Sequence, residues 1–261
     1  LTTGELIATI QASMFSDGSR RMAWEATVLP AWRRQGIGSA LYELGLDKAR
    51  TEGATHFSTP VFVGDGTRNQ EGVLFLQKRG FSRLSAYWQM RVDQLGAQPQ
   101  PEWPRGIEAK PFLQVPNAAE KWAGLIVSAF DEPATAEGVL AQTKEPGSEP
   151  EGYFFALDTR TQQLIGTSRA RLDPTGDGGV TGYVGTVGVL HHYRRRGIAQ
   201  ALILQTLHYL HSKGAESAVL FVEDRNTGAR KLYEGLGWQA VYRSDNYWKT
   251  LNEPPASGRA P

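Results

Sequence analysis

Two short segments of the sequence join arginines to small residues in a way that suits the binding of a phosphate group. Residues 189–202 read VLHHYRRRGIAQAL, and residues 28–41 read VLPAWRRQGIGSAL. In each, an apolar stretch typical of a strand leads into a basic loop and then into a helix-forming run. The first turn of a helix leaves backbone N–H groups without partners, and the helix dipole favours an anion there. Gly197 and Ala199 let that backbone approach an anion closely, so the pattern predicts a phosphate-binding loop in each copy.

The elements that must position these loops can be predicted from hydrophobic periodicity and turn residues. In the first part of the chain we expect a hairpin, a helix, a strand, a short helix and closing strands, at 6–15, 21–29, 39–50, 56–63, 71–78 and 81–92. In the second part we expect strands at 106–112, 153–157, 164–172, 183–190, 218–223 and 239–251, and helices at 118–130, 135–143, about 198–213 and 227–236. Residues 93–104, rich in proline and glutamine, are typical of a linker, and residues 252–261 have the composition of a disordered tail.

The two parts are related by an internal repeat. Asn69 corresponds to Asn226, and Gly80-Phe81 corresponds to Gly237-Trp238, at the same separation along the chain. The first copy has no counterpart of residues 107–163, so we expect it to lack the opening strand and helices. Apolar residues of its sheet, such as Ile7, Ile10 and Trp24, would then need another partner. Because the sequence begins with Leu1 rather than methionine, we expect further sequence upstream.

The motif Arg194-x-x-Gly197-x-Ala199, followed by Asn226 and Gly237-Trp238, resembles the GCN5-related N-acetyltransferase (GNAT) superfamily, and the tandem layout is similar to that of the mycothiol synthases. The resemblance implies an α/β protein of two GNAT-like modules, each a mixed, mostly antiparallel sheet flanked by helices. It divides the chain into a truncated, non-catalytic module at 1–92, a linker at 93–104, a catalytic module at 105–251 and the tail.

The resemblance also implies acetyl-CoA as co-substrate and assigns roles in the second module. Val187 and Val189 would pair with the pantetheine amides, and Asn226 would bond the pantetheine arm. Tyr233 would protonate the departing thiolate; its alternative is a core aromatic residue, and for Asn226 a helix N-cap is compatible with the binding role. The pyrophosphate would be held by the loop residues Arg194, Arg195, Arg196, Gly197, Ile198 and Ala199.

The first copy keeps the binding motif but not the proposed acid. Its CoA-binding candidates are Arg33, Arg34, Gly36, Gly38 and Asn69. The position that corresponds to Tyr233 is Leu76, which cannot donate a proton. We therefore expect this copy to bind CoA without catalysing transfer.

The function predicted is transfer of an acetyl group to a primary amine by direct attack in a ternary complex. An ammonium must lose a proton before it attacks, and Glu223 is the candidate base, with a water chain to solvent as the alternative. A backbone N–H near 187–189 would stabilise the oxyanion. The acceptor is a small-molecule or peptide amine of unassigned identity, and the oligomeric state is left open. A non-catalytic acyl-CoA sensor is the alternative function.

The composition of the chain excludes several kinds of site and disfavours several kinds of partner. The 261 residues carry a formal net charge of +1 and no cysteine, which excludes disulfides, thiolate metal sites and an acyl-cysteine intermediate. The near-neutral chain does not favour a nucleic-acid partner. The histidines at 191, 192, 208 and 211 lack a nearby carboxylate cluster in sequence, so no metal is expected. No apolar run reaches the length of a membrane span, and we expect a cytoplasmic protein.

Overall fold

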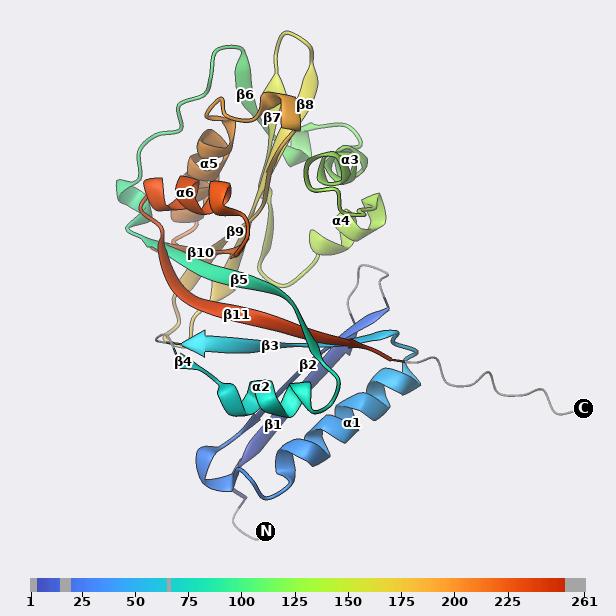
Figure 1. The fold of residues 1–261 in the computed structure, drawn as a ribbon. Helices are drawn as coiled ribbons and strands as arrows, with labels where there is room; N and C mark the ends of the chain where they lie inside the picture. Colours follow the sequence, from blue (N-terminus) through green and yellow to red (C-terminus); the bar gives the residue numbers. More distant parts are fainter. Residues whose placement is uncertain (1–3, 15–19, 65–66, 252–261) are drawn as a thin grey trace, which may run out of the picture. The chain divides into compact units, whose positions relative to one another are not determined.

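The computed structural model describes residues 4–14, 20–64 and 67–251 (Figure 1). The chain divides into two compact units. Unit 1 consists of residues 1–87 and 242–261, and unit 2 consists of residues 88–241. Both boundaries fall inside a strand, within β5 (Ser82–Asp93) and within β11 (Gln239–Thr250).

Unit 1 is built from the antiparallel pair of β1 and β2, further strands joined through β3, and two helices. Its elements besides β5 and β11 are β1 (Ala8–Met14), β2 (Arg21–Val28), α1 (Ile37–Thr51), β3 (His56–Gly64), β4 (Thr67–Arg68) and α2 (Gln70–Gln77). β1 and β2 pair antiparallel in an unbroken register, β2 and β3 pair in parallel, and β3 pairs antiparallel with β11. The helices α1 and α2 contribute to one hydrophobic core with the strands.

The core of unit 1 explains where its apolar strand residues point. Trp24 is buried against Tyr42 and Phe57, with ring centroids 5.9 and 5.7 Å away. Ile10 packs against the same core. The expectation that Ile10 and Trp24 need a partner from elsewhere is therefore wrong, because α1 already covers their face of the sheet.

Unit 2 contains a larger antiparallel sheet and four helices. Its elements are β6 (Ile107–Pro111), α3 (Ala118–Phe130), α4 (Ala136–Gln142), β7 (Ser148–Asp158), β8 (Gln163–Pro174), β9 (Val180–Val189), α5 (Ile198–Ser212), β10 (Ser217–Glu223) and α6 (Thr227–Gly235). The order β10-β9-β8-β7-β6 is antiparallel except for β9 and β10, which are parallel. Alternation along β7 places Tyr153 and Phe155 in the core under α3, and Phe154 in the core under α5. The sheet of unit 2 thus carries helices on both faces (Figure 1).

In both units the two parallel strands pair with each other through only a few residues. β2 pairs with β3 only from Arg21 to Ala23, and β9 pairs with β10 only at Gly182 and Tyr183. Within the part of the chain that the structure describes, the rest of each strand is unpaired on that side. The backbone groups of β2 and β9 next to the basic loops therefore have no ladder partner there.

Two predicted boundaries change. Residues 93–104 are not a free linker, because Leu95 is fully buried in the core of unit 2 and its N–H donates to the carbonyl of Glu216. Residues 243–250 pair with β3, so this part of the last strand belongs to unit 1 rather than to the second module. Residues 252–261, expected as a tail, lie outside the described residues. Among the described helices, none is long and apolar enough to cross a membrane.

Candidate functional site

The two basic loops have the same backbone conformation. Arg34 and Arg195 both have φ of 64°, while Gly36 and Gly197 have φ of 86° and 82°. A positive φ is strained for arginine and easy for glycine. Each glycine is the N-cap of the following helix, α1 or α5, and neither helix has a side-chain cap. The first-turn amides of both helices therefore have no side-chain cap, an arrangement that favours an anion, and anion binding at the two loops stays a prediction.

The first arginine of each motif holds the loop to the end of its strand. Nε of Arg194 donates to the carbonyl oxygen of Val189 at 3.0 Å, and Nε of Arg33 donates to Val28 at 3.1 Å. In unit 2 the guanidinium also donates to the carbonyl of Ala129, at the end of α3, at 2.8 Å. Both arginines fix the shape of the loop, a role that the sequence motif alone did not separate from direct phosphate binding.

A second set of contacts braces the loop of unit 2. The Arg196 guanidinium lies over the Tyr193 ring, 5.1 Å from its centroid, and donates to the carbonyl of His192. The Tyr193 hydroxyl donates to Asp158 at 3.0 Å. Asp158 is buried and also accepts from the N–H groups of Arg160 and Thr161. Burial alone would raise the pKa of Asp158, but these hydrogen bonds lower it. Sequence reasoning missed Asp158, because it lies far from the loop along the chain.

β9 contains a bulge just before the segment predicted to bind pantetheine. The register between β8 and β9 shifts after Thr167, and Thr186 has φ of 51°. Thr167 fixes the bulge by donating from Oγ1 to the carbonyl of Thr186 at 2.8 Å. A bulge leaves its extra residue out of the ladder and re-aims the neighbouring groups. The bulge re-aims the backbone next to Val187, whereas the register of β1 and β2 in unit 1 is unbroken.

Both asparagines of the repeat are helix N-caps. The Asn226 side chain accepts from the N–H of Ala229 at 3.1 Å, and that of Asn69 accepts from Gly72 at 2.9 Å. The oxygen of each amide is thereby used in the helix cap. The amide nitrogen is the part of the side chain that could serve a ligand.

Tyr233 lies on α6 with its ring buried in the core of unit 2. It is 7% exposed and packs against Trp238 at a centroid separation of 6.0 Å. Burial, with a smaller contribution from the nearby phenol of Tyr183, raises the pKa of Tyr233 to about 12. The hydroxyl therefore carries its proton throughout the physiological pH range. Tyr233 can therefore pack its ring in the core and still donate a hydrogen bond from its hydroxyl.

Glu223, the candidate base, ends β10 and is engaged by a neighbour. Its carboxylate forms an ion pair with Nε of Arg225 at 2.7 Å, and its side chain is 26% exposed. Arg225 is itself 84% exposed, so the pair lies at the surface of the unit.

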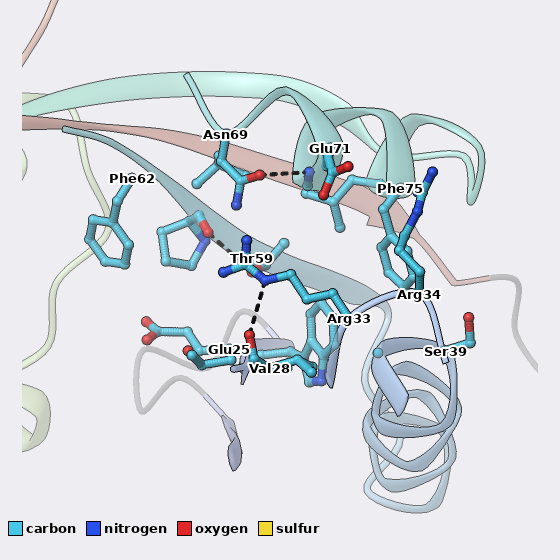
Figure 2. A pocket seen from close by; sticks show the side chains of 18 of the residues that line it. Glu25, Val28, Arg33, Arg34, Ser39, Thr59, Phe62, Asn69, Glu71 and Phe75 are labelled. Carbon is cyan, nitrogen blue, oxygen red and sulfur yellow. Dashed lines mark hydrogen bonds between the residues drawn. The ribbon is translucent and has the colours of Figure 1, made fainter. Parts of the chain in front are cut away.

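Unit 1 contains a pocket of about 600 Å³ beside its own basic loop. It is lined by β2, by β3, by the Arg33 loop and by α2, and Leu76 is part of its wall. In Figure 2, Arg33 extends across the pocket toward Thr59 while its Nε bonds the carbonyl of Val28. All of the CoA-binding candidates of the first copy contribute to this lining, namely Arg33, Arg34, Gly36, Gly38 and Asn69.

Comparison with known proteins gives the family of the chain. The profile of the Acetyltransferase (GNAT) family matches residues 1–81 and 119–238. A mycothiol acetyltransferase of Thermobispora bispora is 31% identical over 227 residues, which cover 82% of this chain and 71% of the relative. One of Mycobacteroides abscessus is 32% identical over 249 residues, covering 89% and 76%.

Solved structures share the fold. A GCN5-related N-acetyltransferase of Sphaerobacter thermophilus aligns with a TM-score of 0.76 at 24% identity, covering 95% of this chain and 78% of the other. A tandem GNAT protein from the clavulanic acid biosynthesis pathway aligns with a TM-score of 0.71 at 17% identity, covering 98% and 82%. The chain belongs to the GNAT acetyltransferase family and is an acyl-CoA-dependent N-acetyltransferase.

Proposed function

We propose that unit 2 transfers an acetyl group from acetyl-CoA to a primary amine by direct attack in a ternary complex. The observation that carries the proposal is the difference between the two copies. Unit 2 has Tyr233 and the bulge at Thr186, whereas unit 1 has Leu76 and an unbroken hairpin. Binding elements are present in both copies, but the groups suited to the chemistry occur together in unit 2.

The binding half of the reaction uses the backbone. Amides of residues 195–199 would hold the pyrophosphate at the start of α5. Val187 and Val189, unpaired on the β10 side beyond Tyr183, would bond the pantetheine amides like an added strand. The thioester would then lie beside the bulge, with a backbone N–H near Val187 donating to its carbonyl oxygen.

The chemical half moves two protons. The amine nitrogen attacks the thioester carbon, the C–N bond forms, and the C–S bond breaks as the thiolate leaves. Tyr233 donates a hydrogen bond to the sulfur and then its proton, and the ammonium formed on the acceptor loses one. A thiol has a pKa of about 8.5, below that of the Tyr233 phenol, which is raised to about 12. Full transfer of the phenolic proton to the thiolate is therefore uphill, the proton lost by the acceptor nitrogen balances the one gained by the thiol, and the donated hydrogen bond is the main contribution of Tyr233 in the transition state.

The second proton leaves through Glu223 or through water. Glu223 stands at the end of β10, three residues before Asn226. Its carboxylate forms an ion pair with Arg225. The acceptor class we propose is a small-molecule amine, because the curated relatives carry the name mycothiol acetyltransferase. A peptide amine is the alternative.

Unit 1 is proposed to hold CoA without turning it over. Its pocket combines the anion loop with the apolar wall at Phe75 and Leu76. Leu76 offers no proton to a thiolate. If both units bound and neither transferred, the chain would be an acyl-CoA sensor, which is the competing function.

The test is a panel of amines with acetyl-CoA, read by release of free thiol, together with calorimetric titration of CoA. Transfer that is lost in Tyr233→Phe, with binding retained, supports the proposal. Binding without thiol release from any amine supports the sensor. Transfer that survives Tyr233→Phe but is lost in Gly36→Val would assign the chemistry to unit 1 instead.

A further inference from the structure

Unit 2 carries a pair of cationic side chains beside the bulge. Arg169 and Arg171 alternate with Ala170 along β8, and their partners on β9 are Gly185 and Tyr183. Ala170 faces the core under α5. The two arginines and Tyr183 therefore share the opposite face of the sheet.

The guanidinium groups gather around one aromatic ring. The Tyr183 centroid lies 4.6 Å from the Arg171 guanidinium carbon and 5.8 Å from that of Arg169. Gly185 makes this arrangement possible, since a Cβ there would come within 3.1 Å of Arg169 Nε and 2.6 Å of the Tyr183 ring. Arg169 thus lies across β9 at the residue before Thr186, where the bulge begins.

The charges of the two arginines are not balanced equally. Arg171 forms an ion pair with Asp173 at 2.8 Å. For Arg169, no carboxylate among residues 4–14, 20–64 and 67–251 lies within ion-pair distance. Nε of Arg169 is buried without a hydrogen-bond partner, as is Nε of Arg171. Arg169 is half-buried, and a buried N–H without a partner costs free energy, so the positive charge and the open donor of Arg169 are features that an anionic ligand would complete.

The two arginines lie near the groups that are proposed to act in the transfer reaction. Tyr183 lies close enough to Tyr233 to influence its ionisation. Arg169 borders the bulge that would receive the thioester carbonyl. An amine that attacks the thioester between these groups must pass near Arg169.

We propose that the acceptor amine carries an anionic group, a carboxylate or a phosphate, and that Arg169 binds this group with Arg171 supporting it. The inference rests on the proposed transfer in unit 2 and narrows its substrate class. Guanidinium is the side chain best suited to planar, bidentate binding of either anion. In unit 1 the corresponding pairs on the hairpin are Gln11 with Glu25 and Ser13 with Ala23, so the cation pair distinguishes the transferring copy.

Two matched acceptor pairs test the proposal by thiol release. L-alanine is compared with L-alaninamide, and O-phosphoethanolamine with ethanolamine, so the pairs separate a carboxylate from a phosphate. We expect kcat/KM for the anionic member of one pair to exceed that of its neutral partner about 10- to 100-fold. Arg169→Gln, which installs the residue of unit 1, should abolish this preference. Arg169→Lys should retain part of it.

Arg91→Gln is the matched control, because Arg91 is a partly exposed arginine of unit 2 paired with Asp93. It should leave the preference unchanged. Thermal melting of the Arg169 variants establishes that they are folded. Equal rates for both members of each pair in the wild type, or a preference that survives Arg169→Gln, overturns the proposal.

A binding measurement separates this proposal from the transfer itself. With the protein saturated with CoA, inorganic phosphate is titrated calorimetrically into wild type and Arg169→Gln. Weaker binding in the variant supports the anion site even if no amine of the panel releases thiol, an outcome that would reject the transfer proposal alone. Equal binding in the two proteins overturns the anion site.

Discussion

Nε of Arg194 donates a hydrogen bond of 3.0 Å to the carbonyl oxygen of Val189, and Arg33 repeats the contact with Val28 at 3.1 Å. The motif arginine thus joins the end of a strand to the loop that follows it. In each unit this contact sets the direction in which the loop amides point. The first arginine of each motif therefore shapes the loop as well as adding positive charge to it.

Replacement of Arg194 by lysine tests this role. A single ammonium cannot reproduce a planar guanidinium that bonds both Val189 and Ala129. Hydrogen bonds to charged groups contribute about 1.5–3 kcal/mol each, so we expect the affinity for acetyl-CoA to fall about tenfold or more. Calorimetry measures the loss. Arg33→Lys is the matched control and should weaken binding in unit 1 while leaving the transfer rate unchanged.

Removal of the Tyr233 hydroxyl tests the acid. Tyr233→Phe keeps the ring that packs against Trp238 and removes only the donor. General acid catalysis typically contributes ~10²–10⁴-fold, so kcat should fall within that range while CoA affinity is unchanged. Single-turnover kinetics separate the chemical step from product release. An unchanged chemical rate would reject the role.

Gly197→Val tests the backbone of the loop. A Cβ at Gly197 meets no atom within 4 Å, so the cost comes from the φ of 82° and from the blocked approach of the pyrophosphate. We expect CoA affinity in unit 2 to drop sharply, as titration of the folded variant would show. Gly124→Ala is the control, because Gly124 lies within α3 with similar open space and an ordinary helical φ. Wild-type affinity in Gly197→Val would contradict the loop assignment.

Asp158→Asn tests the brace behind the loop and its pH dependence. The pKa of Asp158 is lowered on folding, so its stabilisation is present at neutral pH and is lost as the pH falls below the usual range of an aspartate, 3.8. The melting temperature of the variant should therefore lie below that of wild type at pH 7. The two should converge at pH values where the carboxyl of the wild type is protonated. A constant difference across pH would contradict the sign of the shift.

Gly45→Ala tests the packing of unit 1. A Cβ at Gly45 would lie 2.4 Å from Trp24 and 3.2 Å from Phe57, both of which are buried. Overpacking of a core typically costs about 1–3 kcal/mol, and we expect the free energy of unfolding to fall by that amount in a denaturant titration. Gly124→Ala should be neutral or slightly stabilising, since alanine favours the helix. Equal stability of both variants would contradict the tight contact between α1 and β2.

Local patterns explain how much of the fold could be predicted. Periodicity predicted α3 at its observed bounds and α5 to within a few residues, and alternation predicted the two strands β1 and β2 of the first hairpin. The residues that touch their neighbours along the chain, such as Arg194 and Gly197, were found for the same reason.

Long-range pairing is what the sequence could not show. The bulge at Thr186 depends on the register between two strands, and the contact of Asp158 with Tyr193 joins residues far apart. The Arg169 and Tyr183 contact depends on Gly185 as well, whose role is visible only when the strands are paired. The burial of Leu95 likewise comes from a core formed by later elements, which is why its segment resembled a linker.

The boundaries inside β5 and β11 mean that unit 2 is inserted into the sequence of unit 1. Residues 88–241 of unit 2 interrupt unit 1, whose last strand is supplied after the interruption. A fragment that ends near residue 92 would keep β3 but lose residues 243–250, which pair with it. Its exposed edge would then be available to other chains. Separating the two units requires excision of the inner segment and reconnection of the outer ends, rather than a single cut.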